Sequence, residues 1–296
     1  MWEQRAHGLW RPAGMAVGEA DGRVADAIAL LTDGCVLGGW ASLRFQGNDA
    51  FDGRDQELRP ALVHCGAGTQ MRRRKVVEPC RAAVWEHEVT CFEGVPVTTM
   101  ARAVYDEMRL APSLRAAVVA LDSAVAGVRD TAHTSLRAVQ QVVDSHRKTR
   151  GIMRAKKALR LGSERSASPL ETRTRLVAQL DAGLQDQQVN APVFGPSGAL
   201  LGVADLLDEE TGLVIETDGA HHRDAQNHTD DNVREERFER AGLVVVRATS
   251  LDHRDVPGLV HRIRLGHRDA RLSHRRDWTL EQPAWFRSWG PGRRWQ

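Results

Sequence analysis

The sequence predicts a two-domain protein of the mixed α/β class. Its 296 residues are enough for about two domains, each with its own buried core. Segments in which apolar residues recur at helical spacing alternate with short apolar runs bounded by glycine, proline or polar residues. A polar and basic stretch over 128–165 separates two such halves, so we expect a helical connector there.

The N-terminal half, residues 1–127, alternates between helical and strand patterns. Two early segments have helical periodicity, and a later helix begins with threonines, whose hydroxyls are suited to an N-cap. An apolar-rich helix closes this half. In order, the expected elements are helices over 23–31 and 39–45, strands over 61–65 and within 83–97, and helices over 98–108 and 113–127.

Positive charge clusters in the expected connector, just before the C-terminal half. The formal net charge of the chain is only +2, which does not by itself indicate a nucleic-acid partner. Basic stretches are usually solvated helix faces, but a dense one can also contact a phosphate backbone. Both interpretations stay open for Lys156 and Lys157, which are candidate DNA-phosphate contacts.

The C-terminal half, residues 166–268, predicts a helix, a three-strand meander, a second helix and a final strand. Ser168, Pro169 and Glu171 form an S-x-x-E helix start with proline at the first helical position. The expected elements are a helix over 169–182, strands over 189–194, 200–207 and 213–215, a charged helix that ends before Gly242, and a buried strand over 243–250.

Two strands of this meander bring acidic residues together. If Asp208 closes the hairpin turn against Leu213, Asp205 falls directly opposite Glu216 on one face of the sheet. Asp218 shares that face because side chains alternate along a strand. Opposed carboxylates repel one another, and such a cluster takes up a proton or binds a cation; oxygen-only ligation favours Mg²⁺ or Mn²⁺. Simple solvation of an exposed hairpin is the alternative, but Asp205 interrupts an apolar run, where an unpartnered charge is rare.

The segments around these acids resemble a known nuclease family. They are S-P-L-E at 168–171, V-A-D-L-L at 203–207, V-I-E-T-D-G-A-H-H at 214–222, D-x-x-R at 231–234 and V-V-V-R at 244–247. In this order and spacing they resemble the endonuclease-like domain related to very-short-patch-repair nucleases, a branch of the PD-(D/E)xK restriction-endonuclease-like superfamily. The resemblance covers roughly residues 166–265 and implies a central mixed sheet flanked by helices.

The resemblance also implies a function, the hydrolysis of phosphodiester bonds in DNA with Mg²⁺ or Mn²⁺ as cofactor. Asp205 and Glu216 correspond to the acidic metal ligands, and Glu171 to the helix glutamate that often joins them. His222 corresponds to the family's histidine, which would act as general base or steer water. Arg234 and Arg247 stand where the family has basic residues that bind DNA phosphates.

Asp218 departs from the superfamily pattern because it replaces the usual lysine. An aspartate at this position is normal in the branch that the sequence resembles, so Asp218 remains a candidate catalytic residue. The task of orienting water or holding phosphate then passes to His222 or Arg234. The departure also leaves open a second function, that of a non-catalytic DNA-binding regulator with an inactive nuclease fold.

Plainer roles are available to two of the candidates. Glu171 can be the capping-box partner of Ser168 and nothing more. Arg234 can pair with Asp230 or Asp231 at the start of its helix. Both alternatives stay open beside the functional ones.

The N-terminal half has a looser resemblance to type IV (AbiEi-like) antitoxin-type modules. It rests on G-V-P-V-T-T-M-A-R-A-V-Y-D at 94–106 and A-L-D-S-A-V at 120–125, which are similar to actinobacterial proteins that join such a module to this endonuclease-like domain. The resemblance implies that this half positions the nuclease on DNA or on a protein partner such as a toxin. Tyr105, the only tyrosine, is expected in the core.

The remaining features concern location and the chain terminus. Four cysteines lie far apart with no C-x-x-C, so neither a zinc ribbon nor a disulfide framework is expected. The N-terminus does not have the pattern of a signal peptide, and no apolar run approaches the roughly 20 residues that span a bilayer. We expect a soluble cytoplasmic protein without a membrane partner. Residues 269–296, rich in tryptophan and arginine, are expected to form a flexible tail.

Overall fold

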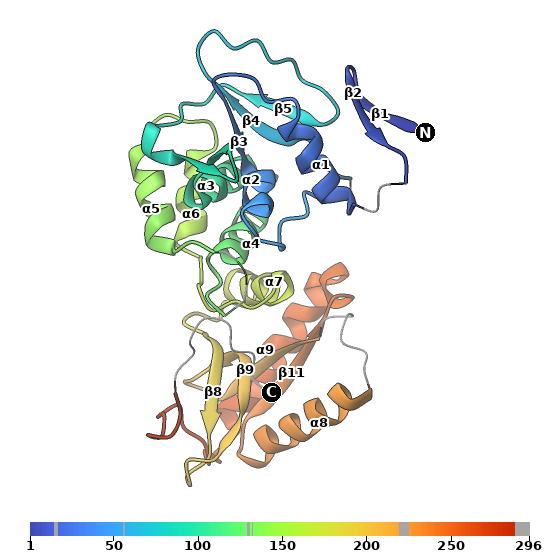
Figure 1. Ribbon diagram of the computed structural model, residues 1–296. Coiled ribbons are helices and arrows are strands. Elements are labelled where there is room, and N and C mark those ends of the chain that lie inside the picture. Colours follow the sequence, from blue (N-terminus) through green and yellow to red (C-terminus); the bar gives the residue numbers. More distant parts are fainter. Residues whose placement is uncertain (15–16, 56, 129–130, 132, 219–224, 288–296) are drawn as a thin grey trace. The chain divides into compact units, whose positions relative to one another are not determined.

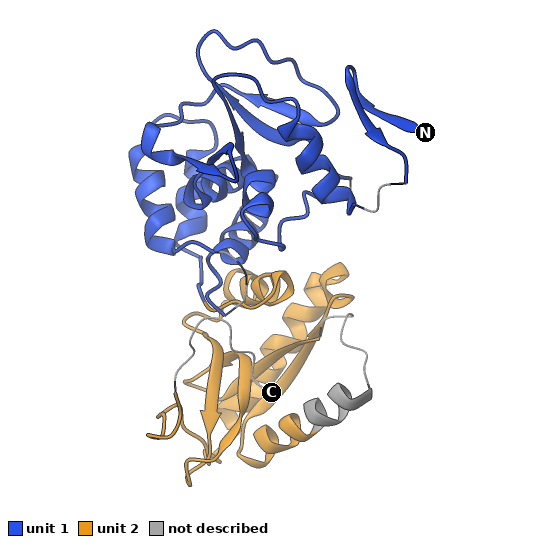
Figure 2. Cartoon of the chain, viewed as in Figure 1, with its two compact units in different colours: residues 1–164 blue, residues 165–296 orange. Residues whose placement is uncertain are grey.

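The computed structural model describes the chain except for residues 15–16, 56, 129–130, 132, 219–224 and 288–296; the side chains of 225–232 are likewise not described. The chain divides into two compact units, Met1–Glu164 and Arg165–Gln296 (Figure 2). Both contain helices and mixed sheets, which confirms the α/β class. Within the described part, no helix combines the length and the apolar character needed to cross a bilayer.

The strands of unit 1 form one hairpin and one mixed sheet (Figure 1). They are β1 (Trp2–Ala6), β2 (Leu9–Pro12), β3 (Cys35–Gly38), β4 (Ala61–Cys65), β5 (Val77–Cys80), β6 (Val89–Phe92) and β7 (Val95–Thr98). The hairpin is β1–β2, and the sheet has the order β5-β4-β3-β7-β6. Pairing is parallel for β4/β5 and β3/β7 and antiparallel for β3/β4 and β6/β7.

The helices of unit 1 follow the sequence pattern closely. They are α1 (Glu19–Ile28), α2 (Gly39–Phe45), the 3₁₀ turn η1 (Glu86–Glu88), α3 (Met100–Leu110), α4 (Leu114–Val125), α5 (Leu136–Ser145) and α6 (Ile152–Leu159). The predicted threonine cap is confirmed, since the Thr99 side chain accepts the backbone N–H of Arg102. The first helix begins four residues earlier than the predicted 23–31, and the predicted strand within 83–97 starts only after η1.

The separate connector predicted over 128–165 is wrong. Helices α5 and α6 pack against α3 and α4, so this stretch belongs to the fold of unit 1. Each of the two helices has small apolar side chains that are completely buried: Val139 and Val143 of α5, and Ala155 and Ala158 of α6. Because these few residues are scattered among many charges, the sequence reads as polar although each helix has one apolar stripe.

Unit 2 has the predicted order of helix, meander, helix and strand. Its elements are α7 (Pro169–Val177) with the π-helical turn η2 (Ala178–Ala182), β8 (Gln188–Phe194), β9 (Leu200–Asp208), β10 (Leu213–Asp218), α8 (Ala225–Arg240), β11 (Val244–Thr249), the 3₁₀ turn η3 (Asp252–Arg254) and α9 (Val256–Leu272). The sheet order is β11-β10-β9-β8. The meander is antiparallel, and β11 runs parallel to β10.

Helices cover both faces of this four-stranded sheet (Figure 1). On one face, Leu206 and Ile215 pack with Ile263 of α9 and with the C-terminal end of α7. On the other face, Leu207 and Val214 pack with Phe238 of α8. Apolar packing therefore covers the middle of the sheet on both faces.

The flexible tail predicted over 269–296 is wrong for the residues that the structure describes. Helix α9 continues to Leu272, and the chain then packs back on unit 2. Trp278 enters the core, and Thr279 exchanges two backbone hydrogen bonds with Phe194 at 2.8 and 2.9 Å. Phe286 packs edge-on against the Phe194 ring at 4.9 Å. Aromatic burial therefore anchors a segment whose lack of periodicity suggested a free terminus.

Candidate functional site

The β9–β10 hairpin has the predicted register. Asp208 faces Leu213, followed by Leu207 with Val214 and Leu206 with Ile215. The turn is closed by Gly212 at a φ of +83°, and the Asp208 carboxylate accepts the Thr211 hydroxyl at 2.7 Å. The regular pairing ends one position before Asp205 and Glu216, so these two carboxylates lie where β9 and β10 separate.

Asp205 bridges the two strands beyond the end of the ladder. Its Oδ2 accepts both the backbone N–H and the hydroxyl of Thr217, each at 2.6 Å. The backbone group that would extend the ladder is thus satisfied by a side chain. Sequence reasoning missed Thr217, because its place on the opposite face by strict alternation hides its role at a point where the strands diverge.

Glu216 is buried near the end of β10, with 8% of the residue exposed. Its Oε2 accepts a hydrogen bond from Nη2 of Arg234 on α8 at 2.6 Å. Its Oε1 is buried and has no hydrogen-bond partner among the described residues. Burial and the adjacent Asp205 charge raise the pKa of Glu216 to about 8, although Arg234 acts in the opposite direction.

Glu171 lies in the first turn of α7 and is also buried. Ser168 caps the helix as predicted, accepting the backbone N–H of Glu171 at 3.1 Å. The Glu171 Oε2 in turn accepts the N–H of Ala167 at 2.8 Å, so the glutamate does support the helix start. Burial and the Asp205 charge raise the pKa of Glu171 to about 7. Glu171 therefore has the structural role and also belongs to the acidic cluster around Asp205.

Asn190 of β8 is a further member of this site that sequence reasoning missed. Its Nδ2 donates to Oε2 of Glu171 at 2.8 Å and to the carbonyl of Arg165 at 2.7 Å. The residue is buried and has a φ of +47°, a conformation that asparagine tolerates better than most residues. The only signal in the sequence is an asparagine inside the apolar run VNAPVF.

The acidic cluster thus consists of Glu171, Asp205 and Glu216, which differs from the predicted patch. Burial and the charge of Asp205 raise the pKa of both glutamates, so Asp205 interacts electrostatically with each of them. Asp218, predicted to share the patch, is exposed as the last residue of β10. His222 lies outside the described residues.

The basic candidates have defined positions. Arg234 pairs with Glu216 and so lies at the acidic cluster. The side chains of Asp230 and Asp231, its predicted alternative partners, lie outside the described part of the structure. Arg247 of β11 is in register with Glu216, and its guanidinium forms an ion pair with Glu235 of α8. Lys156 and Lys157 are exposed on α6 in unit 1.

The donor set fits a hard divalent cation in its chemistry. Among the described residues, no group of three or more histidine, cysteine, aspartate or glutamate side chains stands in a ligand arrangement. Even so, the cluster offers only carboxylate oxygens, which suit Mg²⁺ or Mn²⁺, and one of them, Oε1 of Glu216, is buried without a partner. The Arg234 guanidinium already supplies positive charge at Glu216, and a cation would relieve the repulsion that remains.

The raised pKa values predict a specific dependence of stability on pH. Glutamate has an ordinary pKa of 4.5, and Glu216 and Glu171 have values of about 8 and 7 in the folded chain. Between these values the folded state keeps protons that the unfolded chain has lost. The contribution of the two glutamates to stability is therefore fully present below about pH 4.5 and is lost as the pH rises towards 8.

Glu216→Gln should remove part of this decline, because glutamine keeps an acceptor for Arg234 but has no charge to bury. Between pH 5.5 and pH 8.5, we expect the free energy of unfolding to fall by about 2 to 3 kcal/mol less in the variant than in the wild type. Urea denaturation at both pH values measures this difference. An equal change of stability in both proteins would show that Glu216 ionises normally.

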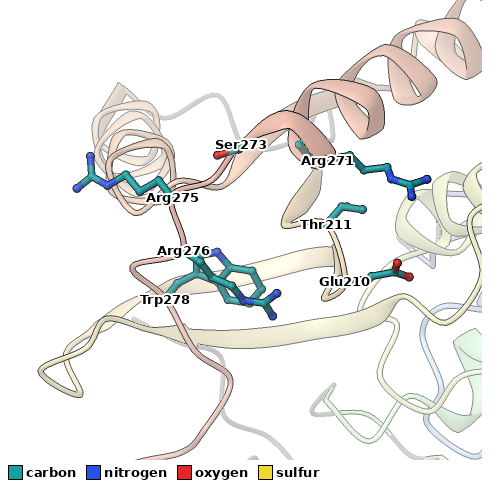
Figure 3. Close-up of a pocket in the computed structure, with 8 residues that line it drawn as sticks. Glu210, Thr211, Arg271, Ser273, Arg275, Arg276 and Trp278 are labelled. Carbon is teal, nitrogen blue, oxygen red and sulfur yellow. The ribbon is translucent and has the colours of Figure 1, made fainter.

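A pocket of about 180 Å³ lies at the other end of the hairpin (Figure 3). It is lined by Glu210 and Thr211 of the turn and by residues at and after the end of α9: Ala270, Arg271, Ser273, Arg275, Arg276 and Trp278. The Arg276 guanidinium stacks 4.4 Å above the Trp278 ring. Because the turn residues are five or more positions from Glu216 along the strand, this basic pocket is separate from the acidic cluster.

Comparisons with known proteins add no assignment to this geometry. The sequence matches no protein-family model, and neither the curated proteins nor the solved structures gave a significant match.

Proposed function

We propose that unit 2 is a metal-dependent DNA endonuclease that hydrolyses phosphodiester bonds, with Mg²⁺ or Mn²⁺ as its cofactor. The observation that supports this most directly is the pair of buried carboxyl groups, Glu171 and Glu216, beside the Asp205 charge. Holding several acidic groups together in a buried place reduces the stability of the fold. Sites of this kind are often functional. The resemblance to the very-short-patch-repair branch agrees with the proposal.

Three residues would hold the cation, namely Asp205, Glu216 and Glu171. When bound, a divalent cation supplies Lewis acidity towards a phosphodiester and lowers the pKa of water. The protein prepares the ligands beforehand. Thr217 fixes Oδ2 of Asp205, while Asn190 and the Ala167 N–H fix Oε2 of Glu171. These side chains would therefore lose little conformational entropy when a cation binds.

Basic side chains of unit 2 would bind the DNA. Arg234 is partly exposed, with 36% of its side chain accessible, and its guanidinium can turn from Glu216 to a phosphate once a cation neutralises the carboxylate. Arg247 is in register with Glu216 on the neighbouring strand β11. His222 is the general base that the resemblance supplies. In unit 1, the exposed Lys156 and Lys157 would contact the phosphate backbone of the DNA.

Nicking of supercoiled plasmid by the full chain tests the proposal. We expect nicking in Mg²⁺ or Mn²⁺ that stops with EDTA and returns when Mn²⁺ is added in excess. Glu171→Gln keeps an acceptor for the Ala167 N–H but loses the charge, so it should slow nicking by about 10- to 100-fold. The matched control is Glu209→Gln in the exposed hairpin turn, which should nick at the wild-type rate.

Two outcomes would contradict these assignments. Nicking at an unchanged rate in EDTA would remove the metal from the reaction. Full activity of Glu171→Gln would limit that residue to its role at the helix start.

A second function is favoured by the ion pair between Arg234 and Glu216. A fixed guanidinium at this position can take the place of a metal ion. The domain would then have an inactive nuclease fold and act as a DNA-binding regulator of antitoxin type. The exposed Asp218, where the superfamily has lysine, points the same way. DNA binding that persists in EDTA, with no nicking and no heat of Mn²⁺ binding by calorimetry, would establish this function instead.

A further inference from the structure

Unit 1 holds a cysteine beside a buried histidine. Cys80 is the last residue of β5, the edge strand of the five-stranded sheet, and is partly exposed. In the parallel pair β4/β5 it is in register with His64 of β4. Side chains of residues in register project from the same face of a sheet, so the thiol and the imidazole are neighbours.

His64 is held by a carboxylate on its other side. Its Nε2 lies 2.7 Å from Oδ2 of Asp106 on α3, and both side chains are almost completely buried. Asp106 is itself fixed by Arg102 and Arg109. The second ring nitrogen of His64, Nδ1, is buried and has no hydrogen-bond partner among the described residues. A protonated imidazole in this place has an N–H available for an anion.

The charges around Cys80 favour its thiolate. Burial lowers the pKa of His64, but the charge of Asp106 and the hydrogen bond to it raise the value to about 9, so the imidazole is cationic at neutral pH. Burial likewise raises the pKa of Cys80, but His64 and, to a smaller extent, Arg109 lower it to about 7. The Arg109 guanidinium also donates to Sγ of Cys80 at 3.3 Å.

The nearest other thiols lack this environment. Cys65, one residue beyond His64, has a raised pKa because of burial and of its neighbour Cys35, whose Sγ lies 4.0 Å away. Cys35 is buried, and Cys91 is exposed on β6. Cys80 therefore combines three properties that a reactive thiol needs: an adjacent cation, a fixed orientation and access to solvent.

We propose that Cys80, His64 and Asp106 form a nucleophilic thiolate site that hydroperoxides oxidise to a sulfenic acid. The Cys80 thiolate attacks one oxygen of hydrogen peroxide, an S–O bond forms and the O–O bond breaks. The departing hydroxide takes a proton from the His64 imidazolium and leaves as water. Sulfur is oxidised by two electrons and the peroxide is reduced, and thiols reverse the product. This site is independent of the function proposed for unit 2.

Peroxide treatment of the reduced full chain tests the site. Dimedone traps sulfenic acids, and mass spectrometry then quantifies the label at each cysteine. We expect Cys80 to be labelled about tenfold faster than Cys91 at pH 7, because the thiolate is the form that attacks peroxide, and His64 and Arg109 favour the thiolate of Cys80. Cys91→Ser should leave the Cys80 rate unchanged. Labelling of Cys91 at the same rate as Cys80, or faster, would overturn the proposal.

Alkylation by iodoacetamide provides a second readout, which a purely structural cluster would not shift. In the wild type, the Cys80 rate should be half-maximal near pH 7, and His64→Gln should move this midpoint upwards by at least about one pH unit. A wild-type midpoint above about pH 8.5 would sink the proposal, whether or not the variant folds.

Discussion

Asp205→Asn should lower the rate of metal-dependent nicking by about 100- to 1,000-fold, the range found when one preorganised electrostatic contact is removed from an active site. Asp205 is the charge that both Glu171 and Glu216 respond to, so it is the common element of the cluster. Asparagine keeps an oxygen that accepts the Thr217 N–H and hydroxyl, so the strand ends stay bridged while the negative charge is lost.

Plasmid nicking at saturating Mg²⁺, with circular dichroism as a check of folding, measures this effect. The same substitution should lower the pKa of Glu216, because one of the two causes of its increase is gone. Infrared titration of the carboxyl band reports that change without any activity. Wild-type nicking by the variant would exclude Asp205 from the reaction, and an unaltered titration would show that the two carboxylates are not neighbours.

Arg102→Met should destabilise unit 1 by about 3 to 5 kcal/mol, the usual cost of removing one partner from a buried ion pair. Arg102 is completely buried on α3. It donates to Oε2 of Glu88 at 2.6 Å, to Oδ2 of Asp106 at 3.1 Å and to the carbonyl of Ala83 at 2.8 Å. Methionine fills much of the volume but leaves the Glu88 carboxylate and the Ala83 carbonyl without this donor.

Urea denaturation followed by circular dichroism measures this loss as a shift of the unfolding transition to lower urea concentration. The matched control is Arg160→Met, an exposed arginine that follows α6, which should change stability by less than about 0.5 kcal/mol. A loss below about 1 kcal/mol for Arg102→Met would mean that water or the neighbouring His146 compensates for the missing guanidinium.

The hairpin register and the element order of unit 2 could be predicted because local chemistry fixes them. Asp208 and Gly212 define the turn, and a two-residue period then sets every partner. The charge of Asp205 within an apolar run marked the site. The end of the β9–β10 pairing at Leu206 could not be predicted, nor could the effect of Asp205 on Glu171 or the exposure of Asp218.

The other features that could not be predicted from the sequence depend on contacts between distant segments of the chain. Arg102 looks like an ordinary helix-surface arginine, since nothing local indicates that Glu88 lies opposite. His64 and Cys80 are sixteen positions apart, and only the parallel pairing of β4 and β5 makes them neighbours. Asn190 likewise becomes informative once its positive φ and its bond to Glu171 are known.

The return of the C-terminal segment to Phe194 has a consequence for solubility. β8 is the outer strand of its sheet, and an outer strand has unpaired amide groups that invite pairing with another copy of the chain. The two hydrogen bonds between Phe194 and Thr279 occupy one end of this row, and Pro192, which lacks an N–H, interrupts it further along. Together they hinder intermolecular sheet extension, so the aromatic packing around Phe194 also opposes aggregation.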